Sequence, residues 1–460
     1  MLRKNKYILC FSEGNGNYFL CNFINKSVVE IDEEALSLLN RKQAYTSEEK
    51  KIIDIFKQHK FLVPENYNEL EEIRNLEEFK KQKEISTKFS SFEIIVTWQC
   101  NLNCVYCLEK PIKGVKRENL DLKKVKKIFE FIDTHLIDTK EKTISLTGGE
   151  PLLIRNNVVV SKILEEGKKR DFKFHITTNG TMLKEYSDLL LKKYKDDISR
   201  IRVTVDGPKE IHNDRRPFLN GKGSFEKIVE GVNFFLEKDF SKFTIITKFD
   251  ERNIDYIRNT VEMFKKLGWI DKFTIVFGLV HNYGVNIGNN FLEKRKNILR
   301  KMIKFFEDYP QLIDVIKFDD GCGSLEIIKN LFFKAKLPKI KYFNCNGIML
   351  QNVITFAPEG KIYPCTFFAM YDMHPVGNYI NPYLDIEIIS RLKKRNVFNL
   401  KKCHDCKFLL ICGGGCPFKD SIKGNIDLFN TSCLQKDLME NEISEFFFKM
   451  RKQKEVNKDE

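Results

Sequence analysis

The sequence contains no long apolar run, and no segment approaches the roughly 18 consecutive apolar residues of a membrane-spanning helix. At the amino end, the apolar stretch from Tyr7 to Phe11 is too short for the core of a secretory signal peptide. Charged residues make up 31% of the chain, as in proteins that fold in water. We therefore expect a cytoplasmic protein with no membrane partner.

A concentrated basic patch is also missing. The chain has 78 Lys and Arg against 64 Asp and Glu, a net charge of +14, but no short block holds the excess, and residues 1–75 are close to neutral. Aromatic residues do not alternate with Arg as they do in strand-binding grooves. We expect no nucleic acid partner.

Cysteine is absent from the long stretch between Cys107 and Cys322, and this gap divides most of the 13 cysteines into two groups. A chain of 460 residues buries enough apolar surface to fold without disulfides. Clustered thiols in a reducing compartment therefore indicate metal ligands. Cys10 and Cys21 stand apart from both groups, and we interpret them as small core residues.

Strand and helix patterns alternate six times between Phe92 and Phe306. The expected strands are Phe92–Thr97, Thr143–Thr147, Phe174–Thr178, Ile201–Val205, Phe243–Phe249 and Phe273–Val280. Amphipathic helices are expected after them at Leu122–Leu136, Asn157–Lys169, Leu183–Tyr194, Ser224–Glu237, Asn253–Leu267 and Phe291–Phe306. This alternation predicts an α/β fold, a partial (β/α)6 barrel of the TIM type, with its chemistry on loops at the carboxyl ends of the strands.

The sequence changes character on both sides of this barrel. A hairpin across Gly14 and Asn15, a third strand and two capped helices predict a small winged-helix-like unit at the amino end. Loop-rich, cysteine-rich sequence after Asp319 predicts a separate metal-organised domain closed by a helix over Leu434–Lys452. The expected divisions are the amino-terminal unit 1–75, a linker with a bridging helix 76–91, the barrel 92–318, the cysteine-rich domain 319–452 and a tail 453–460.

Three cysteines follow the first barrel strand in the pattern Cys100-x3-Cys104-x2-Cys107. A 4Fe-4S cluster has four irons, so three thiols leave one iron open to a small molecule, whereas structural zinc takes four protein ligands. Zinc completed by a distant His or Cys is the alternative. With Tyr106 just before the last cysteine, the segment resembles the signature of the radical S-adenosylmethionine (SAM) enzymes, whose partial barrel matches the predicted units. The resemblance implies a cluster held by Cys100, Cys104 and Cys107, SAM chelated at its open iron, and cleavage of SAM to a 5′-deoxyadenosyl radical.

Two further loops support the resemblance. Gly148, Gly149 and Glu150 resemble the motif that holds the amino group of SAM in that family, and a bare glycine turn is the alternative. Asn179 ends the third expected strand, where similar segments in the family reach SAM. A plain turn from strand to helix is the alternative for Asn179.

Asp206 ends the fourth expected strand and precedes a loop with two arginines, Arg215 and Arg216. A guanidinium there could take the carboxylate of SAM as a bidentate pair, because the two groups match in geometry. We take Arg215 as the candidate and leave the choice between the arginines open. An Asp–Arg pair that braces a long loop is the alternative.

The carboxyl-terminal cysteines keep the order Cys345-x14-Gly360-x4-Cys365, then Cys403-x2-Cys406-x5-Cys412-x3-Cys416, then Cys433. This order resembles the SPASM extension of radical SAM enzymes that modify peptides, which implies two auxiliary 4Fe-4S clusters. By position, one cluster would be held by Cys403, Cys406, Cys412 and Cys433, and the other by Cys345, Cys365 and Cys416. Cys322 or a substrate thiol would complete the second cluster. A zinc ribbon is the alternative, and it leaves several of these cysteines without a role.

The double resemblance favours an enzyme that matures ribosomally made peptides by forming a thioether or carbon–carbon crosslink. Its implied partners are a precursor peptide, whose leader binds residues 1–75, and an electron donor such as flavodoxin or ferredoxin. Anaerobic sulfatase-maturing enzymes, which oxidise Cys or Ser to formylglycine, are the alternative. They carry an Asp after the cysteine that matches Cys365, where this chain has Thr366. A non-catalytic electron-transfer or redox-sensing protein is a third hypothesis, although it has no use for the Gly-Gly-Glu motif.

Overall fold

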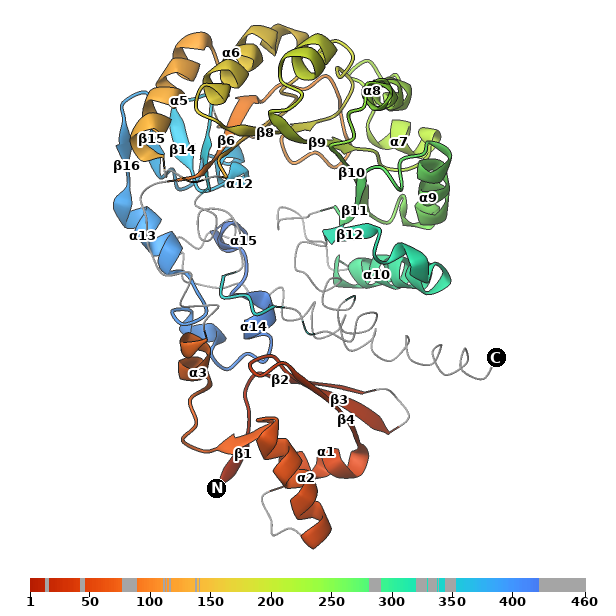
Figure 1. The fold of residues 1–460 in the computed structure, drawn as a ribbon, viewed down its shortest axis with the longest axis vertical. Helices are drawn as coiled ribbons and strands as arrows, with labels where there is room; N and C mark the ends of the chain where they lie inside the picture. Colours follow the sequence, from red (N-terminus) through yellow and green to blue (C-terminus); the bar gives the residue numbers. More distant parts are fainter. Residues whose placement is uncertain are drawn as a thin grey trace.

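The computed structural model describes most of the chain (Figure 1). The residues outside the described part are 13–15, 42–45, 77–88, 111, 113, 116, 137–138, 140, 281–290, 320–328, 330–336, 338, 344–352 and 422–460. The predictions that fall there concern Cys322, Cys345, Cys433, most of the linker 76–91, the helix over Leu434–Lys452 and the tail. Within the described residues no helix is both long enough and apolar enough to cross a membrane.

One sheet of 11 strands organises the described part of the chain. In sheet order its strands are β12 (Ile316–Asp319), β11 (Thr274–Leu279), β10 (Phe243–Phe249), β9 (Ile198–Thr204), β8 (Lys173–Thr178), β7 (Thr143–Gly148), β6 (Ser91–Thr97), β13 (Val353–Phe356), β14 (Lys361–Tyr363), β15 (Gly377–Asn378) and β16 (Tyr383–Leu384). Neighbouring strands are parallel from β12 to β13, and the last three strands continue the sheet in antiparallel fashion.

The parallel strands curve into an arc, and helices cover its outer face (Figure 1). These helices are α5 (Leu122–His135), α6 (Asn157–Lys168), α8 (Phe225–Glu237), α9 (Ile257–Lys266) and α10 (Phe291–Asp308), with short turns η1 (Ile154–Asn156), η3 (Ile254–Tyr256) and η4 (Pro310–Leu312). Strand residues on the outer face, such as Ile144, Ile176 and Ile245, are fully buried in the core. The prediction of an α/β fold with a partial TIM-type barrel is confirmed.

Some elements differ from the sequence expectation. The predicted helix over Leu183–Tyr194 is reduced to a π-helical segment, η2 (Asp188–Lys193), and the expected loop after Asp206 contains a helix, α7 (Lys209–Arg215). The short strands β12 and β13 were not predicted, because each has only four residues. β12 pairs with the preceding strand β11, whereas β13 pairs with β6, which lies far earlier in the chain. Through β13 to β16, part of the expected separate domain is continuous with the barrel sheet.

The amino-terminal residues form a small unit with its own core. Strands β2 (Ile8–Ser12), β3 (Asn17–Asn22) and β4 (Ser27–Asp32) make an antiparallel sheet, β1 (Leu2–Lys4) pairs with β5 (Leu62–Pro64), and the helices are α1 (Glu33–Asn40), α2 (Ser47–Gln58) and α3 (Glu69–Asn75). Thr46 and Glu49 form a reciprocal capping box that fixes the start of α2. Leu20, Leu38 and Phe56 are buried in this unit.

Short helices complete the carboxyl-terminal part: α12 (Thr366–Met370), α13 (Ile386–Lys394), η7 (Lys401–Cys403), α14 (Leu409–Cys412) and α15 (Pro417–Ser421). The amino-terminal unit is attached near α14 (Figure 1). The hydroxyl of Tyr7 donates to the carbonyl oxygen of His404 at 2.8 Å, and Lys6 pairs with Asp405 at 2.8 Å. The segment between Cys403 and Cys406 therefore contacts the amino-terminal unit directly.

Candidate active site

The three-cysteine loop begins where β6 ends, and hydrogen-bond donors surround its first thiol. The sulfur of Cys100 accepts from the backbone N–H of Leu102 at 3.4 Å and from the side-chain amide of Asn179 at 3.6 Å. The same amide donates to the side-chain oxygen of Asn101 at 2.8 Å. Asn179, predicted as a SAM contact, is thus placed beside the thiol of Cys100.

Gly148 and Gly149 let two strand-end loops touch backbone to backbone. Gly148 has a φ of +114°, and a Cβ there would lie 2.2 Å from the carbonyl oxygen of Thr97. A Cβ on Gly149 would lie 2.4 Å from the carbonyl oxygen of Gln99. The N–H of Gly149 donates to the Thr97 oxygen at 2.8 Å. No other residue type allows this approach, so the glycines hold the start of the cysteine loop.

Glu150 is completely buried and ties the second strand-end loop to the third. One carboxylate oxygen accepts from the hydroxyl of Thr178 at 2.7 Å and from the N–H of Leu152 at 2.9 Å. The other accepts from the N–H of Asn179 at 2.6 Å. Burial raises the pKa of Glu150, and these donors oppose that effect. Glu150 therefore holds the backbone of Asn179 in position, and this role is separate from its predicted contact with the amino group of SAM.

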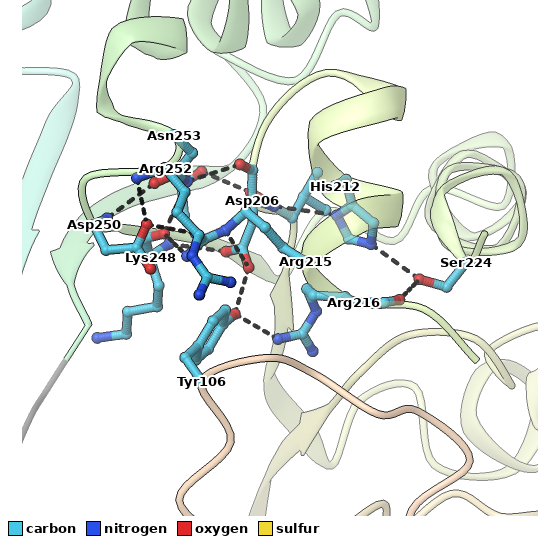
Figure 2. Close-up of polar contacts among 12 residues, drawn as sticks. Tyr106, Asp206, His212, Arg215, Arg216, Ser224, Lys248, Asp250, Arg252 and Asn253 are labelled. Carbon is cyan, nitrogen blue, oxygen red and sulfur yellow. Dashed lines mark hydrogen bonds and ion pairs between the residues drawn. The ribbon is translucent and has the colours of Figure 1, made fainter. Parts of the chain in front are cut away.

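Tyr106 lies at the centre of a polar network between the cysteine loop and α7 (Figure 2). Its hydroxyl donates to the carboxylate of Asp206 and accepts from Arg216 Nη1, the latter at 2.7 Å. Burial raises the pKa of Tyr106 well above its ordinary value, so the phenol stays protonated and can donate. Asp206 also accepts from the N–H of Lys248 at 3.0 Å.

The two arginines of α7 and its end have different surroundings (Figure 2). Arg215 is 1% exposed, pairs with Asp250 at 2.6 Å and donates to the carbonyl oxygen of Lys248 at 3.1 Å. The guanidinium of Arg215 thus braces the loop, in agreement with the alternative of an Asp–Arg pair. The buried Nε of both arginines has no hydrogen-bond partner among the described residues, but Arg215 is held in ion pairs with Asp206 and Asp250, whereas Arg216 contacts Tyr106 through Nη1. Arg216 is therefore the better placed of the two to accept a carboxylate.

His212 is buried between α7 and α8 and serves the same loop. Its ring accepts from the N–H of Asp206 at 3.1 Å and contacts the hydroxyl of Ser224 at 3.1 Å, and that hydroxyl donates to the carbonyl oxygen of Arg216. Burial is the main cause that lowers the pKa of His212 well below its ordinary value, and the positive charges of Arg216 and Arg215 lower it further. A neutral histidine here fixes the backbone of Arg216.

The loop cysteines suit an iron–sulfur cluster by their donor chemistry. Burial raises the pKa of Cys100 to about 12 and that of Cys107 to about 11, so both thiols would release a proton on binding a metal. The amide and N–H donors around Cys100 would then stabilise its thiolate. In the described ranges, no set of three His, Cys, Asp or Glu side chains is arranged to hold a metal ion.

The other described cysteines fall into two groups. Cys403, Cys406 and Cys412 interact with one another near α14, and burial raises the pKa of Cys412 to about 11. Cys365 and Cys416 belong to a different apolar cluster, which includes Trp98 after β6. The loop between Cys412 and Cys416 is held by Arg395, which donates to the carbonyl oxygens of Gly414 and Gly415 at 2.9 and 2.6 Å.

Glu93 connects the barrel interior with the segment after Cys365. This β6 carboxylate accepts from the hydroxyl of Thr355 at 2.8 Å and from the hydroxyl of Thr366. The sequence gives no sign that Glu93 is a site residue, because the threonines it contacts follow some 260 residues later and no local pattern marks it. Nearby, Trp98 donates to Glu359 at 2.8 Å and stacks on Arg117.

A curved parallel sheet with three cysteines, a glycine pair and a carboxylate network at its carboxyl edge defines a partial-barrel enzyme that binds its cofactor at that edge. Residues 94–264 match the family model described as "Radical SAM superfamily". The chain therefore contains a radical SAM domain and is an enzyme. Radical SAM domains use a 4Fe-4S cluster and SAM, and the match favours an enzyme over a non-catalytic electron carrier.

Relatives support this assignment over most of the chain. A serine-type anaerobic sulfatase-maturating enzyme from Bacteroides thetaiotaomicron is 25% identical over 345 residues, which cover 69% of this chain and 80% of the relative. The radical SAM cyclopropyl synthase TigE from Paramaledivibacter caminithermalis is 21% identical over 450 residues, with coverage of 90% and 89%.

A solved structure shares the fold over nearly the whole length. Streptococcus suis SuiB bound to S-adenosylmethionine aligns with a TM-score of 0.52 and 17% identity, covering 94% of this chain and 98% of SuiB. SuiB bound to its precursor peptide SuiA gives a TM-score of 0.53 at 16% identity with the same coverage.

Proposed function

We propose that this protein is a radical SAM peptide maturase that forms a thioether or carbon–carbon crosslink in a ribosomally made precursor. The observation that carries the proposal is the amino-terminal unit, a small sheet attached to the segment between Cys403 and Cys406. SuiB, whose fold this chain shares, has a structure with its precursor peptide bound.

SAM is proposed to bind at the carboxyl edge of the barrel. Cys100, Cys104 and Cys107 would hold the cluster, which supplies the electron that cleaves SAM. Arg216 would take the carboxylate of SAM, because Tyr106 fixes its orientation and the alternative, Arg215, is already paired with Asp206 and Asp250. Asn179 would keep the loop beside Cys100 in place.

Two auxiliary clusters are proposed in the carboxyl-terminal part. Cys403, Cys406 and Cys412, with Cys433, would hold one, and Cys365 and Cys416, with Cys345, the other. A crosslink removes two hydrogens from the peptide, and 5′-deoxyadenosine carries away one of them. The remaining electron and proton need acceptors, and an auxiliary cluster would accept the electron. A flavodoxin or ferredoxin in the cytoplasm is the proposed electron source.

The leader peptide is proposed to add as a strand along β4. Within the described residues β4 is an edge strand that pairs with β3 alone, while the region next to β2 contacts the His404 segment. Val28 on β4 is 42% exposed, which leaves apolar surface for a leader side chain. Strand addition then fixes the leader through main-chain hydrogen bonds and raises the local concentration of the reacting segment.

The test uses the full-length protein, reconstituted without oxygen, with a short Cys-rich peptide encoded beside its gene. We expect about twelve irons per chain and turnover of the peptide that depends on its leader. A leader with a mid-strand Pro should bind more weakly than one with Ala at the same position, because Pro removes a backbone donor. Equal turnover with and without the leader would refute the recognition role.

Sulfatase maturation remains the second candidate because Glu93 brings a carboxylate next to Thr366. That carboxylate could serve where the sulfatase-maturing enzymes carry an Asp. The test is a short sulfatase peptide containing the target Cys or Ser. Formation of formylglycine at a rate comparable to crosslinking would favour this candidate, whereas an unchanged peptide would reject it.

A further inference from the structure

The inner faces of β8 and β9 carry basic side chains that the proposed SAM site does not use. On β8, Phe174 and Ile176 are buried against the helices, and on β9, Ile201 and Val203 are buried in the same way. Side chains alternate along a strand, so the residues between them face the concave side of the sheet, the barrel lumen. These lumen residues are His175, Thr177, Arg200 and Arg202.

The register of the two strands brings the basic groups together. His175 is the Cα partner of Arg200, and Thr177 is the partner of Arg202. Arg200 and Arg202 are exposed to solvent, yet desolvation is the main cause that lowers the pKa of Arg202, and the charge of Arg200 is next. Arg202 is thus accessible from the concave side of the sheet while neighbouring groups partly shield it from water. Burial and the two arginines lower the pKa of His175 to about 4.

The charges of two carboxylates act on Arg202, but each carboxylate is bonded to other residues. Glu93 on β6 and Asp319 on β12 both act on its charge, although each is three strands away. A flat sheet would separate them from Arg202 by about 14 Å, so the curvature of the sheet brings these groups together. Glu93 accepts from two threonines, and Asp319 pairs with Lys248 at 2.8 Å.

No hydrogen bond or ion pair joins the side chain of Arg200 or Arg202 to another residue that the structure describes. Two guanidinium groups on one strand, two residues apart, repel each other, and a bound anion would relieve that repulsion. A planar guanidinium pairs with a carboxylate through two parallel hydrogen bonds.

We infer that Arg202, supported by Arg200 and His175, binds a carboxylate of the substrate peptide within the barrel lumen. The inference rests on the proposed peptide substrate and narrows it to peptides with an acidic group near the residue attacked. The group is either an Asp or Glu side chain or the carboxyl terminus, which share the same chemistry.

The position of Arg202 sets the spacing. Arg202 lies two residues before the carboxyl end of β9, which is about 7 Å below the SAM loops at the usual rise per residue. An extended peptide covers this distance in about two residues. The acidic group is therefore expected within about two residues of the modified one.

The test measures binding of three small probes by saturation-transfer NMR to the reconstituted protein with saturating SAM, so that Arg216 is occupied. The probes are N-acetyl-aspartate N-methylamide, the corresponding asparagine compound, and N-acetylglycine, which carries a terminal carboxylate. We expect a carboxylate probe to bind and the asparagine probe not to bind. Arg202→Gln should weaken binding about tenfold or more, Arg202→Lys less, and Lys123→Gln on the exposed face of α5 not at all.

Binding of the aspartate probe alone identifies a side-chain carboxylate, and binding of N-acetylglycine alone identifies the carboxyl terminus. Equal binding of the aspartate and asparagine probes, or unchanged binding to Arg202→Gln, overturns the inference. Folding of each variant is checked by its cleavage of SAM without peptide. The assay measures binding and needs no turnover. A failure of the proposed maturase function can therefore be distinguished from a failure of the inferred carboxylate site.

Discussion

Replacing Gly149 by Ala tests how tightly the glycine pair positions the cysteine loop. The added Cβ would lie 2.4 Å from the carbonyl oxygen of Gln99 and 2.7 Å from the backbone carbon of Trp98, where ordinary contacts begin at 3.4 Å. The Gln99 backbone therefore has to move by about 1 Å. Overpacking of this kind costs about 1–3 kcal/mol of stability. A shift of about 1 Å at a reacting centre can cost about 10²-fold in rate.

We expect Gly149→Ala to cleave SAM about 100-fold more slowly than the parent, measured as 5′-deoxyadenosine formed with dithionite and no peptide. Gly167→Ala is the matched control, because its Cβ would meet the ring of Phe174 at 2.7 Å, between α6 and β8. The control should lower the melting temperature by a similar amount and keep SAM cleavage. Parental cleavage by Gly149→Ala would refute the positioning argument.

Three further predictions concern single groups of the site and the lumen. Arg216→Lys should weaken SAM binding about tenfold, because lysine lacks the forked guanidinium that pairs with a carboxylate. Arg215→Lys should instead lower the melting temperature with little change in SAM affinity. Calorimetric titration with SAM distinguishes the two variants, and equal SAM affinities would contradict the assignment. Replacing Cys100, Cys104 and Cys107 by Ala should abolish 5′-deoxyadenosine formation. Replacing Cys403 and Cys406 should preserve SAM cleavage but abolish the peptide product. A triple variant that forms 5′-deoxyadenosine as fast as the parent would show that the catalytic cluster lies elsewhere. The pKa of His175 is about 4 in the folded protein, below its unfolded value of 6.5, so its stabilising contribution is present above pH 6.5 and is lost as the pH falls toward 4. The free energy of unfolding, measured with urea, should therefore change more steeply with pH between 6.5 and 4 in the parent than in His175→Gln. Parallel curves for the two proteins would count against the lumen environment.

The barrel could be predicted from the sequence because its strands and helices are encoded locally. β10 spans Phe243–Phe249 as expected, and α5 and α6 differ from the expected helices by one residue at their ends. Each such element has a strong period of its own and a short connection to the next. The cysteine motif is equally local, since its residues lie within one loop.

Other features depend on contacts between distant parts of the chain. The choice between Arg215 and Arg216 follows from which guanidinium meets Asp250 and which meets Tyr106, and neighbouring positions in a sequence do not reveal that. Glu93 gains its place from Thr355 and Thr366, far along the chain. The strand β13 forms because β6 offers it a parallel neighbour, not because four residues favour a strand on their own.

Formation of 5′-deoxyadenosine coupled to a change in peptide mass tests the proposed maturase function most directly. The reconstituted protein is incubated without oxygen with SAM, dithionite and the leader-bearing peptide, and both products are followed by mass spectrometry. The proposal predicts that 5′-deoxyadenosine rises with peptide that has lost only hydrogen, as a crosslink requires. Peptide that remains unmodified while SAM is cleaved, or a Cys residue that loses its sulfur to become an aldehyde, would contradict it.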